Sequence, residues 1–113
     1  MARHPSRRQV MGRAAAFAAV LPSPLVSASN AKVHDIDIRS FAFVPAQVRV
    51  TRGDTLRWTN RDLAPHTATA DEFGWDTAEL AQGETAQVVV TEGMETSYFC
   101  VFHPHMTGTI EIV

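Results

Sequence analysis

The sequence predicts an all-β protein, a Greek-key β-sandwich of about seven or eight short strands preceded by a cleavable signal segment. Three observations favour this class. From residue 33 onward, short stretches alternate apolar with polar residues, turns containing glycine or proline separate them, and no stretch of ten or more residues has helical periodicity. With 113 residues the chain has room for one domain.

Residues 1–28 are expected to be an export signal rather than part of the domain. They contain four arginines and no acidic residue, and Arg7 and Arg8 form a twin-arginine pattern ahead of the apolar run 14–21. That run is too short to span a membrane, because a span needs roughly 20 apolar residues. We therefore expect export to the periplasm by the twin-arginine route, without stable membrane insertion after cleavage.

Small residues suit cleavage after Ala28 or Ala31, which leaves residues 29–113 as the domain. This domain keeps six of the ten basic residues and all twelve acidic ones, so its net charge is −6 with histidine neutral. Such a balance argues against binding to nucleic acid, which requires basic patches. It leaves a basic protein partner open, although charge alone does not identify one.

The expected strands follow one another in short steps. They lie at residues 33–38, 40–45, 48–50, around Leu56 and Trp58, and at residues 67–70, 86–90, 96–100 and 109–113. Residues 51–54, which contain Gly53, are expected to form a hairpin turn. By alternation, the core candidates are Phe43, Leu56, Trp58, Val88, Phe99 and Ile110.

Residues 98–108 contain most of the candidate metal ligands. Cys100, His103 and Met106 follow one another at intervals of three, and Cys100 is the only cysteine. We expect a strand to end at Cys100, a loop to run past Pro104, and Gly108 to turn the chain into the last strand. A tight loop of this kind can direct all three side chains toward one point. An unpaired cysteine in an exported protein is explained if it binds a metal.

A thiolate, imidazoles and a thioether together describe a blue-copper site, with two His and one Cys in a plane and a weak axial Met. The loop supplies one histidine, and His66 is the candidate for the second. Soft sulfur ligands suit Cu(I) and imidazoles suit Cu(II), so the mixed set suits both oxidation states. Zinc is the main rival metal, but Met is a poor zinc ligand. A covalent haem would require Cys-x-x-Cys-His, which is absent from the sequence.

The spacing Cys-x2-His-x2-Met resembles the ligand loop of the amicyanin type within the cupredoxin family. The match includes Pro104 directly after His103 and Pro65 directly before His66. It extends over about residues 36–113.

This resemblance implies a role as well as a fold. It implies one type 1 copper ion bound by His66, Cys100, His103 and Met106, with Met106 axial. It further implies a one-electron carrier that is not an enzyme, is monomeric, and docks transiently with a redox donor and acceptor. The electron is expected to leave through the exposed edge of His103.

Two residues depart from the amicyanin pattern. His105 stands where the family commonly has an aromatic residue, and Pro104 placement favours His103 over His105 as the ligand. Thr67 stands where the family commonly has Asn, whose side chain ties the two ligand loops together. Threonine has one short hydroxyl, so we expect it not to reproduce both amide contacts, which leaves the reduction potential open. His34 is expected to face solvent.

Three alternatives stay open. The first is a copper-binding or delivery protein without electron transfer, although residues 29–113 hold only Met94 and Met106 as thioethers. The second is an enzyme with Cys100 as nucleophile and His103 as base, for which no orienting third residue is evident. The third is a metal-free interaction module of immunoglobulin type.

Overall fold

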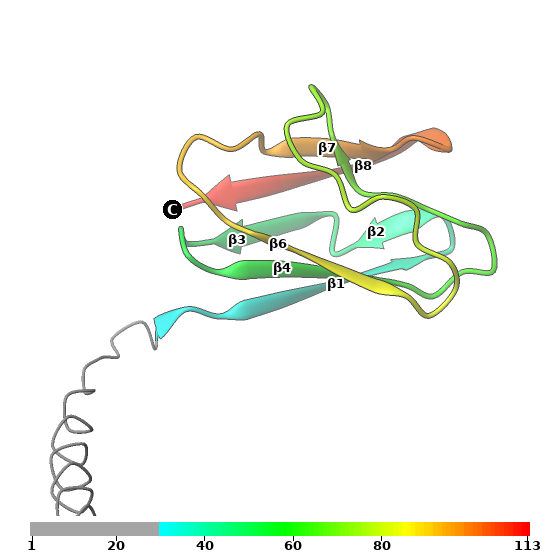
Figure 1. Ribbon diagram of the computed structural model, residues 1–113, viewed down its shortest axis with the longest axis horizontal. Coiled ribbons are helices and arrows are strands. Elements are labelled where there is room, and N and C mark those ends of the chain that lie inside the picture. Colours follow the sequence, from blue (N-terminus) through cyan, green and yellow to red (C-terminus); the bar gives the residue numbers. More distant parts are fainter. Residues whose placement is uncertain (1–29) are drawn as a thin grey trace, which may run out of the picture. The chain divides into compact units, whose positions relative to one another are not determined.

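In the computed structural model, residues 30–113 are described, and the elements that follow one another in them are eight β-strands. Eight strands form two four-stranded sheets that stack as a sandwich (Figure 1). The predicted β-sandwich is therefore confirmed. The predicted signal of residues 1–28 lies outside the described residues. Within residues 30–113, no helix is long and apolar enough to cross a membrane.

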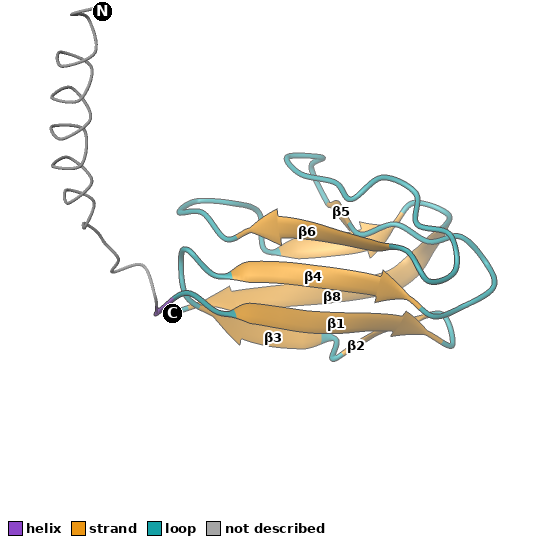
Figure 2. Ribbon diagram, turned by 60° about the horizontal axis from the view of Figure 1, so that its bottom comes forward, coloured by secondary structure: helices purple, strands orange, loops and turns teal. Residues whose placement is uncertain are grey.

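The first sheet has the strand order β2-β1-β4-β6. Its strands are β1 (Val33–Arg39), β2 (Ala42–Val44), β4 (Thr55–Asn60) and β6 (Thr85–Val89). Strands β1 and β4 run parallel, whereas β1 pairs with β2, and β4 with β6, in antiparallel fashion. Figure 2 shows β1, β4 and β6 in front of the second sheet.

The second sheet has the order β3-β8-β7-β5. Its strands are β3 (Gln47–Val50), β5 (Thr69–Ala70), β7 (Ser97–Cys100) and β8 (His103–Ile112). Strands β3 and β8 run parallel, and β7 pairs antiparallel with both β8 and β5. Because β7 and β8 are neighbours in this sheet, residues at the ends of the two strands can meet.

The core lies between the sheets, as the alternation predicts. Every second residue of β4 is buried, and the inward set is Leu56, Trp58 and Asn60. Burying an aliphatic or aromatic side chain of this size contributes about 1.5–3 kcal/mol. Among the predicted core residues, Phe43, Leu56, Trp58 and Ile110 are buried. Val88 and Phe99 are only partly buried.

The turn at residues 51–54 is not a hairpin, and that prediction was wrong. The turn joins β3 in the second sheet to β4 in the first, so it carries the chain from one layer to the other. Asp54 is buried there, and its carboxylate accepts hydrogen bonds from the backbone N–H groups of Lys32 and Thr51. Local turn signals are the same whether the next strand pairs with the previous one or leaves the sheet, which is why the sequence pattern misled.

The final strand begins earlier than expected. Strand β8 starts at His103, so Gly108 lies inside it opposite Tyr98 and does not turn the chain. A Cβ at Gly108 would overlap the Tyr98 ring, which explains the glycine by close packing.

His34 also differs from its expected solvent-facing role. Its Nε2 lies 2.8 Å from Oδ2 of Asp54, and its side chain is only 26% exposed.

Candidate metal centre

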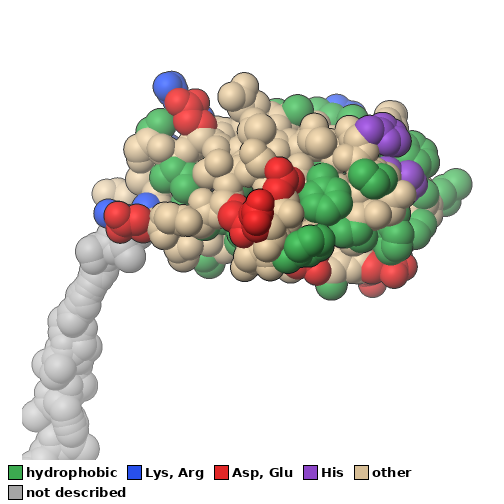
Figure 3. All heavy atoms as spheres, turned by 90° about the horizontal axis from the view of Figure 1, so that it is seen from above, with side chains coloured by type: hydrophobic (Ala, Val, Ile, Leu, Met, Phe, Trp, Pro, Cys, Tyr) green, Lys and Arg blue, Asp and Glu red, His purple; other side chains and the backbone are tan. Residues whose placement is uncertain are grey.

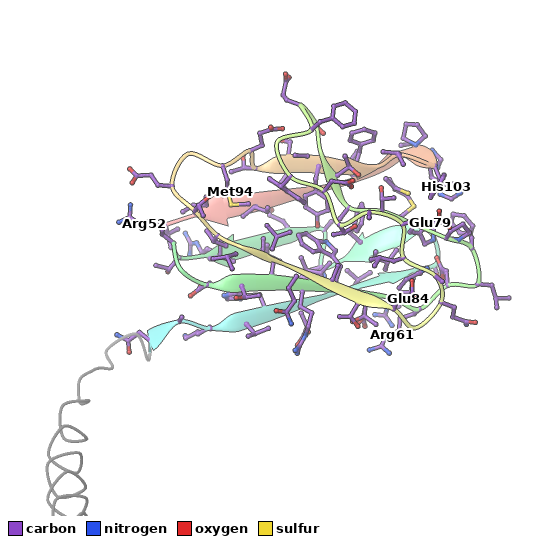
Figure 4. The ribbon with its side chains drawn as sticks, viewed as in Figure 1. Arg52, Arg61, Glu79, Glu84, Met94 and His103 are labelled. Carbon is purple, nitrogen blue, oxygen red and sulfur yellow. The ribbon has the colours of Figure 1, made fainter. Side chains whose placement is uncertain are left out.

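Three metal-binding side chains converge at one end of the sandwich. His66 lies in the segment between β4 and β5, Cys100 ends β7, and His103 begins β8. Their ligand atoms all lie within 4.8 Å of one another. The Cys100 Sγ is 3.7 Å from the His66 Nδ1 and 3.6 Å from the His103 Nδ1. Figure 4 shows His103 at this end of the strands and Arg52 at the other.

The β7–β8 hairpin brings Cys100 and His103 together. The two residues are direct partners in the antiparallel register, with only Val101 and Phe102 between them in the turn. Directly opposed residues of an antiparallel pair project from the same face of a sheet. The register shifts between Phe99 and Cys100, which marks a β-bulge. Bulges re-aim side chains at such sites.

His66 is fixed through its backbone. Its N–H donates to the Leu80 carbonyl at 3.2 Å, and its carbonyl accepts from the Leu80 N–H at 2.8 Å. The buried side-chain amide of Asn60 donates to the carbonyls of Ala64 and Leu80, both at 2.9 Å. His66 itself is fully buried. Sequence reasoning missed the supporting role of Asn60, because an inward polar residue at a strand end gives no distinct pattern.

The carboxylate of Asp62 orients the His66 ring. Its Oδ2 lies 2.8 Å from the His66 Nε2. An ionised carboxylate can only accept, so Nε2 carries the proton and Nδ1 presents its lone pair toward Cys100. Burial raises the pKa of Asp62, but hydrogen bonds from the Phe41 N–H, the His66 ring and the Ser40 N–H outweigh it and leave the pKa below its usual range. Sequence reasoning missed Asp62, although an acid four residues before a ligand histidine is a usable signal.

Phe41 covers the two histidines. Its ring meets that of His66 edge-on at 5.1 Å and that of His103 edge-on at 4.8 Å, measured between ring centroids. Ser40 and Phe41 both have positive φ, at 52° and 57°, which is uncommon for residues other than glycine. Asp62 holds this turn by accepting from both of their N–H groups, at 2.7 and 2.9 Å. Sequence reasoning missed Phe41 because the contact spans the two sheets.

Thr67 links the two ligand segments despite its short side chain. Its N–H donates to the Cys100 Sγ at 3.4 Å, and its Oγ1 accepts from the Val101 N–H at 3.0 Å. The Thr67 hydroxyl therefore makes one link between the two segments, to the residue that follows Cys100.

The remaining predicted residues fall on either side of β8. Met106 is buried, three residues beyond His103, in the same core cluster as Cys100. His105 is exposed and does not belong to the converging group.

The donor set fits one copper ion. One sulfur and two imidazole nitrogens converge where His66 and Cys100 are fully buried, and the buried thioether of Met106 lies three residues beyond His103 on β8. A His2Cys set with a weak Met is the ligand combination of type 1 copper. The carboxylate of Asp62 bonds to the Nε2 of His66 and not to the converging atoms. Within residues 30–113 no carboxylate belongs to the converging group, whereas zinc enzymes commonly have an oxygen ligand.

Comparison with known proteins identifies the fold. A protein-family model described as a cupredoxin-like domain matches residues 12–112. A purple cupredoxin from Nitrosopumilus maritimus is similar over 71% of this chain and 99% of its own, at 22% identity and a TM-score of 0.63. The Cu(I) form of an amicyanin variant matches over 78% of this chain and 90% of its own, at 24% identity and a TM-score of 0.65.

A copper-containing nitrite reductase from Thermus scotoductus also matches, over 71% of this chain at 22% identity and a TM-score of 0.65. The match spans only 22% of the reductase. At these identities the structural matches show the fold alone, whereas the family model covers most of the sequence. The chain belongs to the cupredoxin-like domain family.

Proposed function

We propose that the protein is a type 1 copper electron carrier, exported to the periplasm, with copper held by His66, Cys100, His103 and Met106. The observation that carries this proposal is the convergence of the Cys100 Sγ with two imidazole Nδ1 atoms, at 3.7 and 3.6 Å, at fully buried Cys100 and His66. Bound copper would supply one-electron chemistry between Cu(I) and Cu(II).

The chain's own residues would hold the ligand side chains in place when copper changes its oxidation state. Asp62 fixes the tautomer and orientation of the His66 ring. The Thr67 N–H is aimed at the Cys100 Sγ and stabilises negative charge on it. Phe41 packs on both imidazoles, which limits their rotation and excludes water from that side.

His103 offers the route to a partner. It is partly exposed, unlike His66, and apolar side chains surround this end of the molecule, including Leu63 at 85% and Phe102 at 46% exposure. In Figure 3 the histidines at this end lie among hydrophobic side chains. A modest apolar patch suits brief docking of a redox protein, because electron-transfer encounters bury little area. We propose that the protein itself has no catalytic activity.

Copper titration of the purified protein tests the proposal. We expect an intense visible charge-transfer band that saturates at one Cu(II) per chain, disappears on reduction and returns on reoxidation with the copper retained. Copper that binds without colour would contradict a type 1 site. Copper that is released on reduction would favour delivery over electron transfer.

A further inference from the structure

A chain of hydrogen bonds connects the Cys100 turn to a carboxylate on the surface. The Val101 N–H donates to the Thr67 Oγ1 at 3.0 Å, and that oxygen lies 2.9 Å from the Thr69 Oγ1. The Thr69 hydroxyl in turn donates to Oδ1 of Asp76 at 2.7 Å. Thr67 and Thr69 are both buried, whereas Asp76 is exposed.

The carboxylate decides the direction of every bond in this chain. An ionised Asp76 can only accept a hydrogen bond, so the Thr69 hydroxyl must donate its one proton to the Asp76 carboxylate. Thr69 can then only accept from Thr67, which leaves the Thr67 oxygen free to accept the Val101 N–H. Hydrogen bonds aligned in one direction polarise and strengthen one another.

The backbone holds the far end of the chain in place. Thr69 and Asp76 form an isolated antiparallel bridge. Next to it, the Thr77 N–H donates to the Ala68 carbonyl at 3.0 Å, and the Ala68 N–H donates to the Thr77 Oγ1 at 3.0 Å. The backbone contacts of this loop therefore hold the Asp76 carboxylate next to the Thr69 hydroxyl.

We propose that Thr69 and Asp76 are positioning residues for Cys100, acting through Thr67 on the peptide that follows the cysteine. As a statement about the metal site, this rests on the proposed copper function. Thr67 holds the cysteine from two sides, through its N–H to Sγ and its Oγ1 to the Val101 N–H. Thr69 and Asp76 hold its hydroxyl in the rotamer that makes the second link.

Amide hydrogen exchange in the copper-free protein tests the link without any metal. Val101 is 41% exposed, so its amide depends on the Thr67 Oγ1 for protection. We expect Thr69→Val and Asp76→Ala each to speed exchange of the Val101 amide about fivefold, as loss of one hydrogen bond implies. Asp76→Asn keeps an acceptor oxygen and should restore most of the protection.

Asp71→Ala is the matched control. It removes an equal charge from the same loop, and the Asp71 side chain makes no hydrogen bond within residues 30–113. We expect its Val101 exchange rate to match the wild type. Wild-type exchange at Val101 in both Thr69→Val and Asp76→Ala would overturn the proposal, as would equal acceleration in Asp71→Ala. If Thr69→Val fails to fold, the comparison of Asp76→Ala with Asp76→Asn still tests the proposal.

The copper-loaded protein supplies the second readout. Loss of an outer-shell contact typically lowers metal affinity about 10- to 100-fold, and we expect Asp76→Ala to lower copper affinity about tenfold and to shift the visible band. If the wild type binds no copper, the proposed function fails while the exchange result still stands. If copper binds normally in Asp76→Ala with an unchanged band, the positioning role fails while the proposed function stands.

Discussion

His66 and His34 are held alike at opposite ends of β1. In each case the ring Nε2 lies 2.8 Å from Oδ2 of an aspartate, Asp62 for His66 and Asp54 for His34. Each aspartate also accepts two backbone N–H groups, at least one of them from a distant segment. Asp62 accepts from Ser40 and Phe41, and Asp54 accepts from Lys32 and Thr51.

The two pairs differ in what the second ring nitrogen faces. The His66 Nδ1 points at the Cys100 Sγ, and His66 is fully buried. The His34 ring is partly exposed, and it belongs to no group of converging ligand atoms within residues 30–113. A histidine clamped by an aspartate is thus a way to tie turns together in this fold. It becomes part of a metal centre only where sulfur and a second imidazole meet it.

The strongest break in this comparison is Cys100→Ala. Without the thiolate, we expect the intense visible band to be abolished, because the short bond between copper and the cysteine thiolate would produce the colour. His34→Gln, at the other end, should leave the band unchanged. Absorption spectra during copper titration of both variants measure this. A coloured Cys100→Ala protein would contradict the assignment.

Removing the aspartates compares the two clamps directly. Asp62→Ala should lower copper affinity by about 10- to 100-fold, because an outer-shell partner orients the ligand ring. Asp54→Ala should destabilise the fold but leave copper affinity within about twofold, since it touches no proposed ligand. Competition with a copper chelator gives the affinities. Equal losses in both variants would mean that Asp62 acts only through stability.

The Asp54 clamp should also appear in the pH dependence of stability. Hydrogen bonds from the Thr51 N–H, His34 and the Lys32 N–H lower the Asp54 pKa from 3.8 to about 2. A lowered folded-state pKa means that the stabilisation is present above pH 3.8 and is lost as the pH falls toward 2. Urea unfolding of the copper-free protein from pH 5 downward should show this loss, and Asp54→Asn should flatten it. Identical profiles would refute the clamp.

The smallest expected effect concerns the methionines. Met106→Leu should keep the visible band and raise the reduction potential, because the thioether is a weak axial ligand that mainly tunes. Met94→Leu is the matched control, since Met94 accepts from the Thr91 N–H at 3.3 Å and has no proposed role at the metal. Voltammetry of both variants measures the difference. Loss of copper from Met106→Leu would contradict the axial role.

The ligand spacing could be predicted from sequence because it is local. Cys100 and His103 are three residues apart in the sequence, and the two-residue turn between them makes them direct partners in the β7–β8 register. Alternation likewise placed Leu56 and Trp58 of β4 correctly in the core, although it did not predict that Asn60 is buried beside them.

Most of the supporting contacts could not be predicted, because they join segments that are distant in the sequence. The exception is the position of Asp62, four residues before His66. The Asp62 contacts to Ser40 and Phe41 span 22 and 21 residues, and they exist only once β1, β2 and the His66 segment have packed together. The Thr69–Asp76 bond requires a loop whose shape depends on tertiary pairing. Residue patterns report which faces are buried, but not which turns meet.

The most direct test of the account is a crystal structure of the copper-loaded protein with data collected at the copper absorption edge. We predict one anomalous peak, within bonding distance of the Cys100 Sγ and the Nδ1 atoms of His66 and His103, with the Asp62 carboxylate still on the His66 Nε2. A main peak beside His105, or between His34 and Asp54, would contradict the account.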